Sequence, residues 1–195
     1  MNLRRDVSKA LVGRGFRRNG RMHLLRVDGD WSFWVDTGPL GKRKDISPFV
    51  GVRHDGIERL WSELMEFPND DWVGTVGANV GYVLGTGYKT WEPPSEPKEV
   101  LDSIDSAVER LRPMLSLHAL PQAWSITGAK SPSWRYRDIV IQLLLGNRQA
   151  VPNRLDAARV EMCQQEDEIC AQFRAFEQRI QARLRAQEHS DITTD

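Results

Sequence analysis

The chain is poor in cysteine and histidine and has no long apolar run. Its 195 residues include two cysteines and four histidines. The longest apolar stretch, from Ile139 to Leu145, is interrupted by Gln142 and is far shorter than the roughly 18 residues that a membrane helix needs. The first residues also lack the apolar segment that follows the basic start of a secretory signal. We therefore expect a cytoplasmic protein that does not associate with membranes.

The two cysteines lie in a stretch with helical spacing of apolar residues, from 153 to 187. On one continuous helix, Cys163 and Cys170 would share a face two turns apart, with Cα atoms about 10 Å apart at 1.5 Å rise per residue. A disulfide requires less than about 7 Å. The spacing therefore predicts two buried free thiols, in agreement with a reducing compartment.

Motifs that carry catalysis or bind metals are also absent. No spacing typical of zinc ligands links the four histidines, which are His23, His54, His118 and His189. The segment VGTVGANVG (73–81) lacks the Gly-Lys-Ser/Thr ending of a phosphate loop, so its glycines are typical of close backbone packing in a strand. His54 suits a general base at a strand end, but a turn histidine is the stronger interpretation. The sequence predicts no cofactor and no metal site, and it favours binding over catalysis.

Hydrophobic residues make up 40% of the chain and include seven tryptophans, which indicates a packed core. The formal net charge is zero but uneven: residues 1–54 hold 12 Lys/Arg and 5 Asp/Glu, whereas residues 55–151 hold 9 and 13, and residues 152–195 hold 6 and 9. A basic first part indicates either an anionic partner or pairing with the acidic remainder within the fold. The exact cancellation of charge favours pairing.

Alternation of apolar residues around Asp28-Gly29 predicts a β-hairpin of residues 21–27 and 31–36, with Trp31, Phe33 and Val35 on the core face. Further strands are expected at 46–53 and 72–84. Helical spacing or capping residues predict helices at 2–12, 55–66, 95–113, 131–146 and 153–187. We expect an α+β fold: an antiparallel sheet of about four strands with flanking helices, followed by a C-terminal helical hairpin. The predicted division is an α+β domain (1–125), a helical pair packed on it (126–189) and a disordered tail (190–195).

Basic and aromatic residues of the first part form the candidate binding site, which consists of Arg17, Arg18, Arg21, Trp34, Lys42, Arg43 and Lys44. Arginine and aromatic side chains dominate the energetics of protein interfaces. The same residue types also grip phosphates and stack on bases. Because the whole chain is neutral, an acidic protein surface is the expected partner and nucleic acid is the alternative. The pattern leaves the oligomeric state open.

At Gly15-Phe16-Arg17-Arg18-Asn19-Gly20, the chain resembles the bacterial family catalogued as domain of unknown function 4304. The segments DISPFVGVR (45–53) and VGANVGYVLG (76–85) are similar to that family as well, so the resemblance covers roughly residues 3–120. It implies a bacterial accessory protein and brings no activity and no functional residue with it. The sequence therefore predicts a non-catalytic accessory binding protein of the immunity or defence kind. The alternative is a protein that binds or processes nucleic acid.

Overall fold

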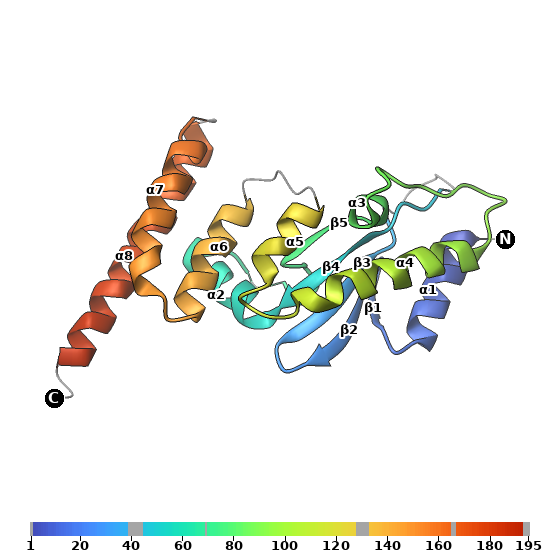
Figure 1. Cartoon of the computed structure of the whole chain (residues 1–195), viewed down its shortest axis with the longest axis horizontal. Coiled ribbons are helices and arrows are strands. Elements are labelled where there is room, and N and C mark those ends of the chain that lie inside the picture. Colours follow the sequence, from blue (N-terminus) through green and yellow to red (C-terminus); the bar gives the residue numbers. More distant parts are fainter. Residues whose placement is uncertain (1, 39–44, 69, 128–132, 165–166, 193–195) are drawn as a thin grey trace. The chain divides into compact units, whose positions relative to one another are not determined.

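The structure is a computed structural model that describes residues 2–38, 45–68, 70–127, 133–164 and 167–192 (Figure 1). The chain forms two compact units. The first contains residues 1–56 and 70–130, and the second contains residues 57–69 and 131–195. Residues 57–69 thus group with the C-terminal helices, although they lie in the part of the chain that the sequence assigns to the first domain.

The first unit is built on an antiparallel sheet with strand order β1-β2-β3-β4-β5. The strands are β1 (Arg17–Asn19), β2 (Met22–Asp28), β3 (Trp31–Asp36), β4 (Phe49–His54) and β5 (Val76–Asn79). The predicted hairpin is confirmed as β2 and β3, which turn at Gly29 with φ of 46°. The α+β class is confirmed, with β1 added at the edge of the predicted sheet.

One face of the sheet is covered by α1 (Leu3–Gly13) and α4 (Pro97–Leu111), which pack against each other (Figure 1). Phe33 and Val35 of β3 lie on this face and are fully buried, as are Val50 and Val52 of β4. Trp31, at the end of the same row, is half-buried. The alternation in β3 therefore identifies the core face correctly, because alternate residues of a strand point to the same side.

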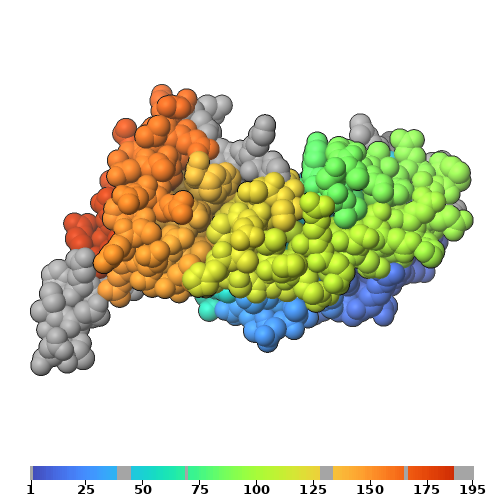
Figure 2. All heavy atoms as spheres, in the orientation of Figure 1, coloured from blue at the N-terminus to red at the C-terminus, as the bar shows by residue number. Residues whose placement is uncertain are grey.

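The predicted strand at 72–84 is wrong in its second half. The chain pairs with β4 only through β5 and then forms the short helix α3 (Val80–Leu84), which packs on α4. In Figure 2, the green and yellow-green side chains of α3 and α4 form one continuous surface. The buried Asn79 side chain ends the strand, because its Oδ1 accepts hydrogen bonds from the backbone N–H groups of Gly81 and Lys89.

The first unit is completed by a 3-10 turn, η1 (Arg112–Met114), and by α5 (Leu120–Thr127). The residue before α4 is Glu96, which makes no capping hydrogen bond through its side chain, and the helix begins two residues after the predicted start at 95. Pro97 occupies the first turn of α4, where its missing N–H costs no hydrogen bond.

The second unit consists of helices. They are α2 (Asp55–Met65, which starts in the first unit), α6 (Ser133–Leu144), the 3-10 turn η2 (Arg148–Ala150), α7 (Val151–Met162) and α8 (Asp167–Ile192). Its core contains a cluster of rings: the Tyr136 ring lies 4.9 Å from Phe176 and 5.7 Å from Phe173, measured between centroids. α8 continues to Ile192, into the stretch predicted as a disordered tail.

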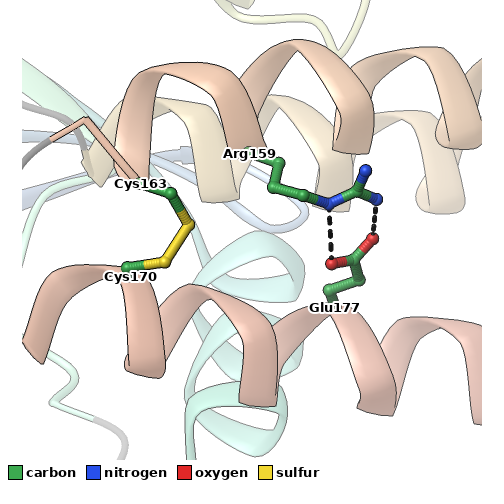
Figure 3. The surroundings of a disulfide bond; sticks show 4 residues. All are labelled: Arg159, Cys163, Cys170 and Glu177. Carbon is green, nitrogen blue, oxygen red and sulfur yellow. Dashed lines mark hydrogen bonds and ion pairs between the residues drawn. A yellow bond between two sulfur atoms is a disulfide. The ribbon is translucent and has the colours of Figure 1, made fainter. Parts of the chain in front are cut away.

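The prediction of one helix over 153–187 with free thiols is wrong. α7 ends at Met162 and α8 begins at Asp167, so the chain reverses there and the two helices form a hairpin. Cys163 and Cys170 then face each other and form a disulfide, with Cα atoms 4.5 Å apart (Figure 3). Arg159 and Glu177 pair across the same two helices, with Nε donating to Oε2 at 3.1 Å. The expected Cα separation of about 10 Å applies only to a continuous helix.

Candidate partner-binding site

The second face of the sheet, opposite α1 and α4, carries the candidate site. Strand pairing places Arg17, Leu24, Trp34, Gly51 and Gly77 in one row across all five strands. The neighbouring row holds Arg26, Ser32 and Arg53 of β2, β3 and β4. Because these residues alternate with the core residues of the same strands, their side chains point away from α1 and α4. We call this side of the sheet the cavity face.

The Trp34 indole packs against three glycine residues. A Cβ atom on Gly51 would lie 2.4 Å from Trp34 Nε1, and one on Gly77 would lie 2.4 Å from Trp34 Cζ2. A Cβ atom on Gly74 would lie closer still, 1.7 Å from Trp34 Nε1, and Trp34 Nε1 donates a hydrogen bond of 3.1 Å to the Val76 carbonyl oxygen. Gly74 and Gly77 thus make room for an aromatic ring. Gly77 lies in β5, in agreement with the prediction of close packing in a strand, whereas Gly74 precedes the strand and Gly81 lies in α3.

Arg53 connects the sheet to the loop at 70–74. Its side chain is buried, and Nη1 donates hydrogen bonds to the carbonyl oxygens of Asp70 (2.8 Å) and Val73. Its Nε donates to Asp55 Oδ1 at 2.8 Å. This guanidinium therefore fixes the loop over the cavity face, and the loop brings Trp72 to the edge of the sheet.

Asp55 forms ion pairs with two guanidinium groups. One is that of Arg53, and the other is that of Arg26, whose Nη1 lies 2.7 Å from Asp55 Oδ2. Burial raises the pKa of the Asp55 carboxyl. The hydrogen bonds and charges of Arg53 and Arg26 outweigh that effect and hold the pKa below its ordinary value. Asp55 is therefore ionised at neutral pH and neutralises one of the two arginines.

A cavity of about 260 Å³ opens between the sheet and this loop. We call it the Arg17–Trp72 pocket; it is lined by Arg17, Leu24, Arg26, Ser32, Asp55, Asp71 and Trp72. The Arg17 guanidinium lies over the Trp72 ring, 5.8 Å from its centroid. Leu24 is buried and supplies an apolar wall. The pocket thus combines an arginine on an aromatic ring with an apolar wall and two aspartates.

The residues predicted to form one binding site lie in different places in the structure. Arg17 and Trp34 share one row of the cavity face, and Arg17 lines the pocket. Arg18 donates through Nε to the Gly20 carbonyl oxygen, and Arg21 pairs with Asp36 at 3.1 Å, so both are engaged at the end of the sheet. The loop that contains Lys42, Arg43 and Lys44 lies outside the described residues.

Six further lining residues are not among the predicted site residues; they are Leu24, Arg26, Ser32, Asp55, Asp71 and Trp72. No local sequence motif predicts them, because only the register of the strands and the position of the 70–74 loop over the sheet bring them together. The one available signal is the hairpin register, which places Leu24 opposite Trp34.

The basic first third is partly paired within its own unit. Arg14 Nη1 lies 2.5 Å from Asp105 Oδ1, and Arg26 binds Asp55. These two pairs agree with the interpretation that the basic and acidic parts neutralise each other in the fold, whereas Arg21 pairs with Asp36 of the basic part itself. Among the described residues, no carboxylate lies within ion-pair distance of Arg17.

The two histidines of the sheet, His23 and His54, make contacts within the fold. Ser8 Oγ and His23 Nε2 are 2.8 Å apart, but both residues are buried, so no substrate reaches this pair. Because His23 Nδ1 lies 3.1 Å from the Arg21 carbonyl oxygen, Nδ1 carries the proton and Nε2 accepts from the Ser8 hydroxyl. Burial lowers the pKa of His23 below its ordinary value of 6.5 and keeps the ring neutral. His54 packs edge-on against Trp31, with ring centroids 4.5 Å apart.

The described part of the chain contains no group of three or more His, Cys, Asp or Glu side chains that could hold a metal ion. Over the same residues, none of the helices is both long enough and apolar enough to cross a membrane. Comparisons of the chain with protein-family models, with curated proteins and with solved structures found no match. The resemblance to the domain of unknown function 4304 family therefore stays a prediction.

Proposed function

We propose that this protein is a non-catalytic binding protein that recognises an acidic surface of a protein partner through the cavity face of its sheet. The observation that supports this function most directly is the Arg17–Trp72 pocket. There, Arg17 of the exposed strand β1 lies over the Trp72 ring and has no carboxylate partner among the described residues. Arginine and tryptophan are the residue types most enriched among interface hot spots.

The pocket is also preorganised, which favours binding. Arg53 holds the 70–74 loop through two backbone carbonyl oxygens, and Asp55 fixes both Arg53 and Arg26. Side chains that are already ordered lose little conformational entropy when a partner arrives. Within this class, we propose an immunity or defence role, on the basis of the density of arginine and aromatic residues and of the resemblance to a family of bacterial accessory proteins.

Charge reversal at the pocket tests the proposal. The protein is immobilised and incubated with extract of its native host, and a stoichiometric partner is identified and then purified. Arg17→Glu should slow association with that partner, because like charges weaken electrostatic steering. The matched control is Arg5→Glu, which makes the same charge change on the exposed side of α1 and should leave association unchanged. Equal effects of the two reversals, or the absence of a stoichiometric partner, would contradict the proposal.

Nucleic acid is the second candidate, and the exposed pair Arg17 and Arg18 on the edge strand β1 is the observation that favours it. Binding to phosphates weakens steeply with salt because counterions are released. Labelled DNA and RNA oligonucleotides are titrated at low and at physiological salt. Tight, salt-sensitive binding that Arg17→Glu abolishes would establish this candidate in place of the protein partner.

A further inference from the structure

The volume of the Arg17–Trp72 pocket limits what can enter it. Its 260 Å³ corresponds to about eight or nine water molecules at roughly 30 Å³ each. Pockets for drug-sized ligands and cofactors begin at about 300 Å³ and reach about 1,000 Å³. The space therefore suits one amino-acid side chain with a few waters and is small for a nucleotide.

The charges in and beneath the pocket limit the occupant further. Three guanidinium groups (Arg17, Arg26 and Arg53) meet two carboxylates (Asp55 and Asp71), which leaves one positive charge. Arg26 and Arg53 both bind Asp55, and Arg53 Nη2 lies 3.8 Å from Asp71 Oδ1. The uncompensated cation is therefore Arg17.

One uncompensated charge favours a monoanion over a phosphate group. A phosphate monoester carries a charge of about −1.5 to −2 at neutral pH. Its second charge would face Asp55 and Asp71, and the described lining residues offer no further cation to balance it. A carboxylate carries one charge and matches the planar fork of one guanidinium with two parallel hydrogen bonds.

Arg17 leaves that fork available. Its guanidinium carbon lies 5.8 Å from the centroid of the Trp72 ring, and among the described residues its N–H groups donate no hydrogen bond to the protein, so they can donate to a ligand. Leu24 and the Trp72 ring supply apolar surface beside it for a short aliphatic stem.

We propose that the Arg17–Trp72 pocket binds one acidic side chain, aspartate or glutamate, of the partner protein. The carboxylate accepts hydrogen bonds from Arg17, and the methylene groups pack against Leu24 and Trp72. This inference rests on the proposed function, because it names the group of the partner that the site recognises.

Fluorine NMR of the full-length protein labelled with 5-fluorotryptophan tests the pocket without the partner. The chain has seven tryptophans, and Trp72→Phe assigns the resonance of Trp72 by its disappearance. The probes are N-acetyl-glutamate amide and its neutral isostere, N-acetyl-glutamine amide. The glutamate probe should shift the Trp72 resonance in a saturable way, and the glutamine probe should not.

Variants of Arg17 show whether the guanidinium carries the effect. Arg17→Gln should weaken the glutamate probe by about tenfold or more, because a charge-assisted hydrogen bond is lost. Arg17→Lys should retain part of the affinity, since the charge remains and the fork is lost. Arg5→Gln is the control and should bind as the wild type does. Unchanged resonances of the other tryptophans show that each variant is folded.

The outcomes separate this inference from the proposed function. Equal shifts from glutamine and glutamate, a stronger response to inorganic phosphate, or no saturable shift would overturn the acidic-side-chain site, even where a protein partner is retained. Saturable, Arg17-dependent binding of glutamate without any protein partner would support the site and count against the proposed function.

Discussion

The ion pair between Glu58 and Arg137 is the most consequential polar contact in the second unit. Arg137 of α6 donates from Nε and Nη2 to the two carboxylate oxygens of Glu58 in α2, at 2.8 Å each. Only 2% of the Glu58 side chain and 7% of the Arg137 side chain are exposed. The guanidinium also lies over the Trp61 ring, 4.4 Å from its centroid.

Removal of one partner should be costly, because the other charge is left buried without compensation. We expect Glu58→Gln and Arg137→Met each to lower the free energy of unfolding by about 3–5 kcal/mol. A typical domain is stable by only about 5–15 kcal/mol, so each change threatens the second unit. The double replacement Glu58→Leu with Arg137→Met removes both charges and should recover most of the loss, since apolar substitutes for buried pairs are often neutral.

Urea denaturation followed by circular dichroism measures the free energy of unfolding of all three variants. The control is Glu63→Gln, on the same helix. Its partner is Arg183 at 2.8 Å, and 62% of its side chain is exposed. A surface pair of this kind contributes at most about 1 kcal/mol. If Glu58→Gln costs no more than Glu63→Gln, the Glu58–Arg137 pair is solvated and the reasoning is refuted.

Three further changes test the first unit. Phe33→Ala should cost about 3–5 kcal/mol because the ring is fully buried, and an unchanged urea midpoint would exclude the core assignment. Gly77→Ala should cost about 1–3 kcal/mol because its Cβ would lie 2.4 Å from the facing indole, whereas Gly13→Ala meets nothing within 4 Å and should be neutral or stabilising. The lowered pKa of His23 means that the unfolded chain takes up a proton below pH 6.5 before the folded protein does. Stability should therefore fall as the pH drops below 6.5, by at most about 1.4 kcal/mol per pH unit, and His23→Gln should remove this slope whereas His118→Gln should keep it.

Local patterns in the sequence predicted most of the first unit. Alternation in β3 identified its core face, and apolar residues at helical spacing located α1 and α4, as well as α2 of the second unit. Each of these patterns depends only on residues of one helix or strand, so it can be recognised without knowledge of the rest of the fold. α3 was missed because its residues Val80 to Leu84 continue the β-type composition of β5. The reversal at this point depends on the Asn79 side chain, which bonds to Lys89 ten residues later.

The candidate site was only partly predictable for the same reason. Arg17 and Trp34 were recognised by residue type, but Asp55 and Trp72 reach the pocket through pairing of β3 with β4 and through the hold of Arg53 on the 70–74 loop. These contacts join residues far apart in the chain, and no spacing in the sequence encodes them.

The break at Cys163 was missed because an apolar stripe does not reveal a change of direction. Met162, Phe173 and Phe176 are all fully buried and keep helical spacing, and two antiparallel helices that face one core produce the same stripe as one long helix. The separation of the cysteines then falls from about 10 Å to 4.5 Å between Cα atoms.

The disulfide is the remaining prediction. Thiol counting in denaturant without reductant should find none per chain, and counting after reduction should find two. The bond closes a loop of only seven residues' separation, for which the loss of chain entropy in the unfolded state predicts about 2–3 kcal/mol of stabilisation. Reduction should lower stability by that amount and leave the hairpin folded, because α7 and α8 still bury Leu155, Met162, Phe173 and Phe176. Two reactive thiols in the protein isolated from its own cells would contradict the closed turn. Disulfides are rare in reducing compartments, so two reactive thiols would also support the predicted cytoplasmic location. A closed disulfide in the protein from its own cells would instead indicate an oxidising compartment.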